Sequence, residues 1–291
     1  MGTQTLHKVF KLVAALAAGL FAFPLLASAT ACDRACLLKH AERFNSAMLR
    51  KSPLDVELSR GAQVRENAEP VALANSKWAA VQRILSKGVF ADPVSGNVIE
   101  HVVGQTAEGK TVYIGTRLKI AGDKVSEVEI NFDDSDRVNL QNLDPYDPIF
   151  NTIVPPEERS TRQQLEHIIA SYFEGLTTHQ PVKAEYDNRC DRYHSGNRVT
   201  HNSRNGIEES GEVGCYESNL GAKPWGPVTE VRVSLIDPER GIVIAYAVLH
   251  YGTSSRRMQI NEVFKILGGR IRMIDNIGLM KEGLTTSGFA R

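Results

Sequence analysis

The chain has 291 residues, in which 34 lysines and arginines balance 34 aspartates and glutamates, and 42% of the residues are hydrophobic. The charge balance excludes the basic excess that nucleic-acid binding needs, and the apolar content excludes a disordered chain. Four cysteines are too few for a small disulfide-rich scaffold. The length predicts one large or two ordinary domains, each with its own hydrophobic core.

Residues 1–31 have the layout of a secretory signal peptide. Two lysines precede an apolar stretch from Leu12 to Leu26, and the small residues Ala-Ser-Ala and Ala-Thr-Ala follow as cleavage patterns. The stretch has about 15 residues, whereas a membrane span needs about 20. A lipoprotein acylated at Cys32 is the alternative, although Ala29 stands where a large aliphatic residue is expected. We therefore expect a periplasmic or secreted protein that has no membrane contact after cleavage.

The cysteines form an even set, which predicts two disulfides in an oxidising compartment. Three connectivities are possible. We expect Cys32 to pair with Cys36 and Cys190 with Cys215, because each pair lies within one segment. A metal site is not expected, since there is no Cys-x-x-Cys pattern and the histidines are not clustered with a third ligand.

An internal repeat is the most informative feature of the sequence. Three segments recur in the same order: 37–53 matches 165–181, 90–99 matches 235–244, and 117–125 matches 263–271. The second copy is longer, and its additional residues fall between Cys190 and Gly226. The repeat predicts two tandem domains of the same fold.

In each copy the pattern predicts an amphipathic helix and then strands. Apolar residues at helical spacing mark the first helix, namely Leu37, Leu38, Ala41, Phe44, Ala47 and Met48. The second helix has the equivalent stripe Leu165, Ile168, Ile169, Tyr172 and Leu176. Ser160 and Gln163 before it match a capping box. The expected strands are 98–103, 111–120 and 125–132 in the first copy, and 229–236, 242–251, 259–267 and 271–274 in the second.

Turn residues separate these strands into hairpins. They are the Asp-Pro-x-x-Gly segments at 92–96 and 237–241 and the pair Gly268–Gly269. A helix followed by a meander of strands predicts an α+β fold with a curved antiparallel sheet. The expected organisation is a signal peptide at 1–31, a first domain at 32–135, a linker at 136–159, a second domain at 160–283 and a tail at 284–291.

The element order and the closing motif E-V-F-K-I-x-G-G-R-I, here Glu262 to Ile271, resemble the nuclear-transport-factor-2-like superfamily. Its SnoaL-like, ketosteroid-isomerase-type members are the most similar. The chain also resembles exported tandem proteins with a Cys-x-Arg-x-x-x-Gly stretch, here Cys190, Arg192 and Gly196. The resemblance implies two tandem cone-shaped domains, each with an apolar pocket at its wide end. Because this superfamily contains both enzymes and plain binding modules, the fold alone does not define a function.

Strand alternation in the second copy places two titratable groups on apolar faces. One face carries Ile242, Ile244, Tyr246, Val248 and His250, and a face of the next strand carries Ile260, Glu262, Phe264 and Ile266. If both faces look into the cone, Glu262 and His250 form an acid–base pair, because an apolar cavity raises a carboxyl pKa. The alternative is that Glu262 points outward and pairs with a neighbouring arginine. Thr116 stands at the aligned position of the first copy, which favours the second copy as the active one.

A second cluster of candidate residues spans 186–194. Asp187 is a candidate base, Arg192 could hold an oxyanion or phenolate, and Tyr186 or His194 could donate a proton. We expect the ligand to contact Tyr186, His194, Tyr246, Phe264 and Trp225. The alternative is a polar surface loop with ion pairs.

The sequence has no nucleophile elbow, P-loop or dinucleotide fingerprint. We therefore expect no cofactor and no metal, and an enzyme that works with side chains alone. The favoured function is a lyase or isomerase that transfers protons, with elimination or retro-aldol cleavage, on a small apolar and in particular aromatic molecule. The rival hypothesis is a periplasmic binding or interaction module without turnover. The expected partner is this ligand, and a homo-oligomer is left open.

Overall fold

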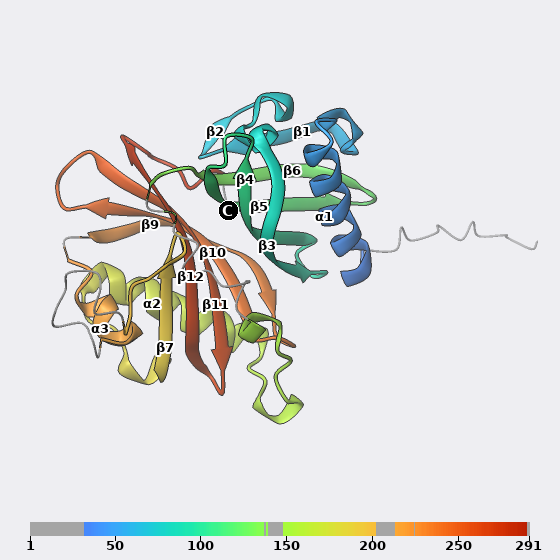
Figure 1. Ribbon diagram of the computed structural model, residues 1–291. Coiled ribbons are helices and arrows are strands. Elements are labelled where there is room, and N and C mark those ends of the chain that lie inside the picture. Colours follow the sequence, from blue (N-terminus) through green and yellow to red (C-terminus); the bar gives the residue numbers. More distant parts are fainter. Residues whose placement is uncertain (1–31, 137, 139–147, 202–212, 224, 290–291) are drawn as a thin grey trace, which may run out of the picture. The chain divides into compact units, whose positions relative to one another are not determined.

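The computed structural model describes residues 32–136, 138, 148–201, 213–223 and 225–289. The expected signal peptide and much of the expected linker lie outside the described residues. Figure 1 shows two sheets, each with a long helix lying across one of its faces. Among the described residues, no helix has the length and apolarity to span a membrane.

The first copy contains one α-helix and six strands. They are α1 (Arg34–Leu49), β1 (Leu58–Glu66), β2 (Glu69–Pro70), β3 (Val81–Asp92), β4 (Asn97–Thr106), β5 (Thr111–Ala121) and β6 (Lys124–Asp133). The second copy repeats this order and adds a short helix. Its elements are α2 (Arg162–Thr178), β7 (Tyr186–His194), β8 (Asn197–Arg198), α3 (Cys215–Leu220), β9 (Trp225–Asp237), β10 (Ile242–Tyr251), β11 (Arg256–Leu267) and β12 (Arg270–Glu282).

The two sheets have the same topology. Their strand orders are β2-β1-β6-β5-β4-β3 and β8-β7-β12-β11-β10-β9. In each sheet the last four strands form an antiparallel meander, and the first long strand runs parallel to the last strand. The expected α+β class is confirmed in its coarse form, since each copy has an N-terminal helix and a six-stranded sheet. The parallel pairs differ from the predicted antiparallel sheet, because their strands are far apart in the chain.

Each helix packs on one face of its sheet, here called the inner face, and the opposite face is called the outer face. The predicted helical stripes are buried against the inner faces, apart from Leu38, which is half-buried. Asp33 caps α1 by accepting a hydrogen bond from the Cys36 backbone N–H. The capping box of α2 is formed by Thr161 and Gln164, one residue later than predicted, because the same Ser/Thr-x-x-Gln spacing occurs twice in succession.

The outer faces carry a third apolar cluster that joins the two copies. It contains Phe90, Ile99, Phe150, Leu235, Ile242, Ile244, Tyr246, Val263 and Met273. Phe150 comes from the segment that connects the copies, and its ring contacts the Phe90 ring edge-on at 6.1–6.2 Å, with a printed centroid distance of 6.2 Å. The two sheets therefore share a core in addition to the core that each has with its own helix.

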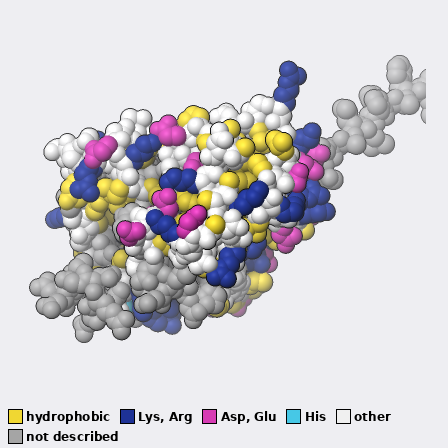
Figure 2. Space-filling model, turned by 45° about the horizontal axis from the view of Figure 1, so that its top comes forward, with side chains coloured by type: hydrophobic (Ala, Val, Ile, Leu, Met, Phe, Trp, Pro, Cys, Tyr) yellow, Lys and Arg dark blue, Asp and Glu magenta, His cyan; other side chains and the backbone are white. Residues whose placement is uncertain are grey.

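Both predicted disulfides are present. Cys32 is bonded to Cys36, and Cys190 is bonded to Cys215. The second bond ties β7 to α3 across the segment that the first copy lacks. On the face drawn in Figure 2, acidic and basic side chains are interspersed, as the neutral overall charge predicts.

Candidate functional site

A fully buried carboxylate lies at the centre of the second sheet. Glu262 is on β11 with its side chain on the inner face, between the core residues Ile260 and Phe264. The prediction that Glu262 stands in an apolar row is therefore correct in position. An ionised group in such a place needs partners, because burial of an unpaired charge is costly.

Three donors meet at one oxygen of this carboxylate. Glu262 Oε1 accepts hydrogen bonds from Asn276 Nδ2 at 2.8 Å, from Tyr172 OH at 3.1 Å and from Arg192 Nη2 at 3.1 Å. These donors come from β12, α2 and β7 respectively. The other oxygen, Oε2, is buried and has no hydrogen-bond partner among the described residues. All the hydrogen bonds that the described residues donate to this carboxylate therefore go to one of its two oxygens.

Burial raises the pKa of Glu262, while the positive charge of Arg192 and the three hydrogen bonds act in the opposite direction. The pKa is raised on balance, because among the described residues only one of the two carboxylate oxygens has hydrogen-bond donors that stabilise the charged form. Burial also raises the pKa of the Tyr172 phenol well above its usual range, so this side chain stays a neutral donor.

A pocket of about 370 Å³ opens beside this cluster. Its apolar walls include Leu176, Trp225 and Met258, and its polar side chains include Arg192, His194 and Glu217. Glu262 does not line the pocket but lies behind Arg192, to which it is hydrogen-bonded. The guanidinium therefore connects the pocket with the buried carboxylate.

The first copy has no such cluster at the equivalent positions. Glu262 pairs with Asn276 across β11 and β12, and in the same register of the first copy Thr116 pairs with Ile130. The remaining equivalents of Tyr172 and Arg192 are Phe44 and Val64. Phe44, Val64 and Ile130 belong to the apolar core of the first copy or pack against it. Thr116 accepts a hydrogen bond from Trp78 Nε1 at 3.2 Å. The polar cluster is thus specific to the second copy.

The predicted pairing of Glu262 with His250 is wrong. The inner face of β10 carries Ala245 and Ala247, whereas His250 shares the alternation of the outer face and hydrogen-bonds Thr229 at 2.9 Å. Tyr246 also lies on the outer face, within the cluster between the sheets, so the structure does not bring it to the pocket. The alternation along a strand correctly predicts which residues share a face. It does not predict which of the two faces is covered by the helix.

The cluster at 186–194 is divided between two places. Arg192 and His194 line the 370 Å³ pocket. Asp187 lines a separate surface depression, where hydrogen bonds from Arg189 lower the pKa of its carboxyl despite partial burial. Tyr186 is buried, and its hydroxyl accepts a hydrogen bond from Asn219 Nδ2 at 2.8 Å.

The two remaining candidate ligand contacts, Trp225 and Phe264, lie in different places. Trp225 lines the pocket, with its ring edge-on to the Tyr251 ring at 4.8 Å. Phe264 lies in the core and contacts the Tyr172 ring at 4.8 Å, so it supports the cluster instead of facing the pocket.

Two members of the cluster were not predicted. Tyr172 was assigned to the apolar stripe of α2, and Asn276 lies just past the expected last strand. A position-by-position comparison of the two copies contains the missing signal, because both residues replace apolar ones of the first copy, Phe44 and Ile130.

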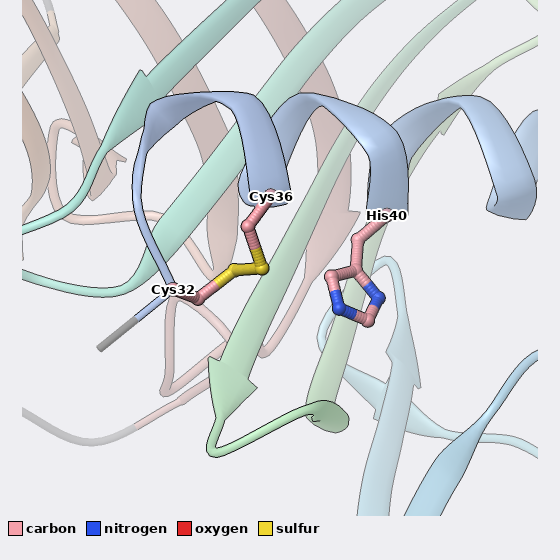
Figure 3. Close-up of side chains that lie close together, drawn as sticks. All are labelled: Cys32, Cys36 and His40. Atoms are coloured by element: carbon pink, nitrogen blue, oxygen red, sulfur yellow. A yellow bond between two sulfur atoms is a disulfide. The ribbon is translucent and has the colours of Figure 1, made fainter. Parts of the chain in front are cut away.

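One group of side chains among the described residues has the composition of a metal site. Cys32 lies just before α1, and Cys36 and His40 lie on it, with potential ligand atoms within 4.8 Å of one another (Figure 3). The two sulfurs are joined in a disulfide and carry no thiolate for a metal. The Cys32–Cys36 disulfide therefore stabilises the start of the helix.

A larger groove of about 680 Å³ lies elsewhere, along α2, β9 and strands of the first copy. Two buried arginines in it are balanced by two glutamates: Arg117 pairs with Glu129 at 2.7 Å and with Glu127 at 2.6 Å, and Arg232 pairs with Glu129 at 2.7 Å. The Phe289 ring lies over the Arg117 guanidinium at 4.8 Å. Arg117 bonds side chains through three of its nitrogens and Arg232 through two, whereas Arg192 uses one among the described residues, and we therefore assign the functional site to the smaller pocket.

Residues 158–278, which include α2 and most of the second sheet, match a domain of unknown function, DUF8021. A comparison with curated proteins finds no match.

Two solved structures are similar to parts of the chain. A putative ketosteroid isomerase from Kribbella flavida has 12% identity and a TM-score of 0.31, over 42% of this chain and 83% of that chain. A LEH-like epoxide hydrolase from M. tuberculosis has 16% identity and a TM-score of 0.29, over 40% of this chain and 84% of that chain. The assignment of a site therefore depends on the residues of this chain.

Proposed function

We propose that the second copy binds a small, mostly apolar molecule, in particular an aromatic one, and acts on it as a cofactor-independent lyase or isomerase. The observation that carries this proposal is the Glu262 carboxyl, in which Oε1 accepts three hydrogen bonds and the buried Oε2 accepts none from the described residues. An oxygen in this state can accept or hold a proton, and the raised pKa brings that exchange closer to neutral pH.

Each member of the cluster has a role in this proposal. Arg192 presents N–H groups to the pocket and holds an oxygen of the substrate, where negative charge develops as a proton leaves carbon. Glu262 takes that proton on Oε2 and returns it at another atom, which is an isomerisation, or the carbanion expels a group, which is an elimination. Tyr172 and Asn276 are positioning residues that fix the carboxyl through Oε1. The substrate reaches Glu262 when Arg192 turns from the carboxylate onto the substrate oxygen.

Export is part of the same proposal. The signal-peptide pattern of residues 1–31 and two disulfides support a periplasmic or secreted protein. Domains at 32–135 and 160–283, with a linker at 136–159 and a tail at 284–291, fit the end of β6 at Asp133 and the start of α2 at Arg162.

A binding protein without turnover is the second candidate. The observation that favours it is that Glu262 is fully buried and lies behind Arg192 instead of lining the pocket. In this case Glu262 acts as the counter-ion of Arg192, and the pocket only holds its ligand.

Hydrogen–deuterium exchange of 2-indanone in heavy water separates the two candidates. This aromatic ketone has acidic C–H groups next to its carbonyl, and their exchange is followed by proton NMR. If the second copy transfers protons, wild-type protein accelerates the exchange and Glu262→Gln loses the acceleration, because the amide cannot act as the base. Glu100→Gln is the matched control, since it changes a buried carboxyl on the inner face of the first sheet.

If 2-indanone binds but its exchange is not accelerated, the lyase or isomerase proposal fails and the binding function stands. Equal acceleration by wild type and Glu262→Gln would remove Glu262 from the mechanism.

A further inference from the structure

The guanidinium of Arg192 has more donors than the protein uses. A guanidinium carries five N–H groups, and among the described residues its only side-chain partner is Glu262, reached through Nη2. The side chain is 11% exposed, and its Nε is buried without a partner. Unpaired buried donors are costly, so a ligand acceptor at this place is favoured. The planar arrangement of N–H groups matches a carboxylate better than a single oxygen.

We propose that the pocket takes an organic carboxylate with an apolar, ring-sized body, that Arg192 holds its carboxylate group, and that binding transfers a proton from solvent to Glu262. This inference rests on the proposed function in one respect, that the 370 Å³ pocket beside Arg192 is the ligand site. It concerns an anionic ligand that leaves Glu262 protonated, which is distinct from an uncharged substrate that gives its proton to ionised Glu262.

The charge balance around Arg192 explains why Glu262 takes up a proton when a carboxylate binds. Without ligand, Arg192 and an ionised Glu262 form a neutral pair at 3.1 Å. A ligand carboxylate on the same guanidinium leaves two negative groups around one positive group, within largely apolar walls. Two adjacent carboxylates cannot both stay ionised at low cost. Glu262 Oε2 accepts no hydrogen bond from the part of the chain that the structure describes, so protonation there breaks none of the contacts seen.

The other charged and titratable groups around this place are Tyr172 on α2, Tyr186 and His194 on β7, and Glu217 on α3. Burial raises the pKa values of both tyrosines, so they stay neutral at ordinary pH. Glu217 accepts a hydrogen bond from the Gly214 backbone N–H at 3.2 Å. Glu217 is the acidic side chain that lines the pocket and Arg192 the arginine, so a ligand anion is favoured at Arg192. His194 is a second basic group, so its contribution to proton uptake has to be measured separately.

Calorimetric titration of the full exported chain with 2-naphthoate tests the proposal, with uncharged 2-naphthamide as the matched neutral probe. We expect 2-naphthoate to bind roughly 10- to 100-fold more tightly, as for hydrogen bonds to a charged group. Titrations in phosphate and in Tris, which differ in ionisation enthalpy, give the number of protons taken up. Where Glu262 is ionised before binding, uptake approaches one proton and affinity falls about tenfold per pH unit.

Variants separate the parts of the proposal. Arg192→Gln should lose the preference for 2-naphthoate over 2-naphthamide. Glu262→Gln should bind 2-naphthoate without proton uptake, and His194→Gln should still take up the proton. Arg189→Gln, an exposed arginine of the same strand that pairs with Asp187, is the control and should behave like the wild type.

Each contrary outcome contradicts a defined part. Equal affinity for the two probes overturns the anion site but leaves the pocket proposal intact. Binding of 2-naphthoate by wild-type protein without proton uptake, or uptake that persists in Glu262→Gln, overturns the proton transfer. If neither probe binds, the ligand site itself is wrong, and the proposed function fails with it.

Discussion

At the scale of single residues, two buried carboxylates show how the fold controls protonation. Glu100 on β4 faces α1, where Asn45 Nδ2 donates to both of its oxygens at 2.8 and 2.9 Å. Burial raises the pKa of Glu100 to about 7, against the opposing charge of Lys87, whose Nζ lies at 3.7 Å. Glu262 is buried to the same degree but has an arginine in direct contact.

The raised pKa of Glu100 makes stability depend on pH in a defined direction. The folded protein holds this proton more tightly than the unfolded chain, so the contribution to stability is complete below about pH 4 and is lost as pH rises through about 7. Glu100→Gln should therefore stabilise the protein by about 3 kcal/mol at pH 8 and have little effect at pH 4. Urea unfolding at both pH values measures this, with the exposed Glu108→Gln as control. A variant that is equally destabilised at both pH values would show that Glu100 is ionised and paired.

The raised pKa of Glu262 predicts the pH dependence of proton transfer. The base is the ionised form, so the rate of 2-indanone exchange should rise with pH through a midpoint above about 4.5 and then become constant. Measurement of this rate from pH 4 to pH 8 gives the midpoint. A rate that falls with rising pH over this range would mean that the protonated carboxyl is the active form.

At the scale of elements, the two copies agree down to individual backbone contacts. In the first copy the Ile120 N–H donates to the Gly96 carbonyl at 2.8 Å, and in the second the Ile266 N–H donates to the Gly241 carbonyl at 2.7 Å. Both glycines close the Asp-Pro-x-x-Gly hairpins and have positive φ angles, 65° and 60°. The predicted equivalence of these hairpins is confirmed.

A side chain at Gly241 should be poorly tolerated. A Cβ atom there would stand 2.1 Å from the Ile266 carbonyl oxygen, and the positive φ adds strain. Gly241→Ala should destabilise the protein by about 3 kcal/mol or more, because backbone must move in addition to a strain of about 1–2 kcal/mol. Gly268→Ala also has a positive φ but no atom within 4 Å, so it should cost only the strain. Equal losses of thermal stability in the two variants would contradict the close contact.

The Cys190–Cys215 disulfide stabilises the segment beside the pocket. It links residues 25 apart, and its removal should cost roughly 2–4 kcal/mol by loop-closure entropy. The double variant Cys190→Ser with Cys215→Ser should lower the unfolding midpoint in urea more than the equivalent change at Cys32 and Cys36, which closes a shorter loop. The opposite order would show that the second bond has little effect on the stability of the whole fold.

Sequence patterns predicted the repeat, the helical stripes, the hairpins and both disulfides, because each of these depends on neighbours along the chain. They did not predict which face of β10 meets the helix, and His250 and Tyr246 were misplaced for that reason. They also did not bring Tyr172 and Asn276 to Glu262, since these contacts join three elements across the sheet. The Asn276 contact depends on the register of β11 and β12, the Tyr172 contact on how α2 packs on the sheet, and local periodicity contains neither.

At the scale of the whole described chain, the outer faces of the two sheets are buried against each other. Polar groups cross this boundary as well: His101 Nδ1 lies 2.8 Å from Asp275 Oδ2, and the Tyr113 hydroxyl donates to the same oxygen. Asn261 lies 3.2 Å from the other ring nitrogen of His101. These side chains are buried, so the polar groups of the first copy find their hydrogen-bond partners in the second copy, and the reverse.

The second copy produced alone should therefore not be a stable monomer. Residues 148–291 would expose the outer-face cluster, and large exposed apolar patches cause association. We expect this fragment to aggregate or to self-associate in size-exclusion chromatography with light scattering. A monomeric fragment with cooperative unfolding would show that the contact between the sheets is dispensable.

An NMR titration of nitrogen-15-labelled protein with 2-naphthol, an uncharged aromatic probe, locates the ligand site most directly. If ligands bind beside Arg192 and Glu262, the shift changes concentrate on β7, β11 and the start of β9 around Trp225, and they disappear in Arg192→Gln. Shift changes centred on the first copy, around Thr116, or on the groove of Arg117 and Arg232 would contradict the assignment of the site.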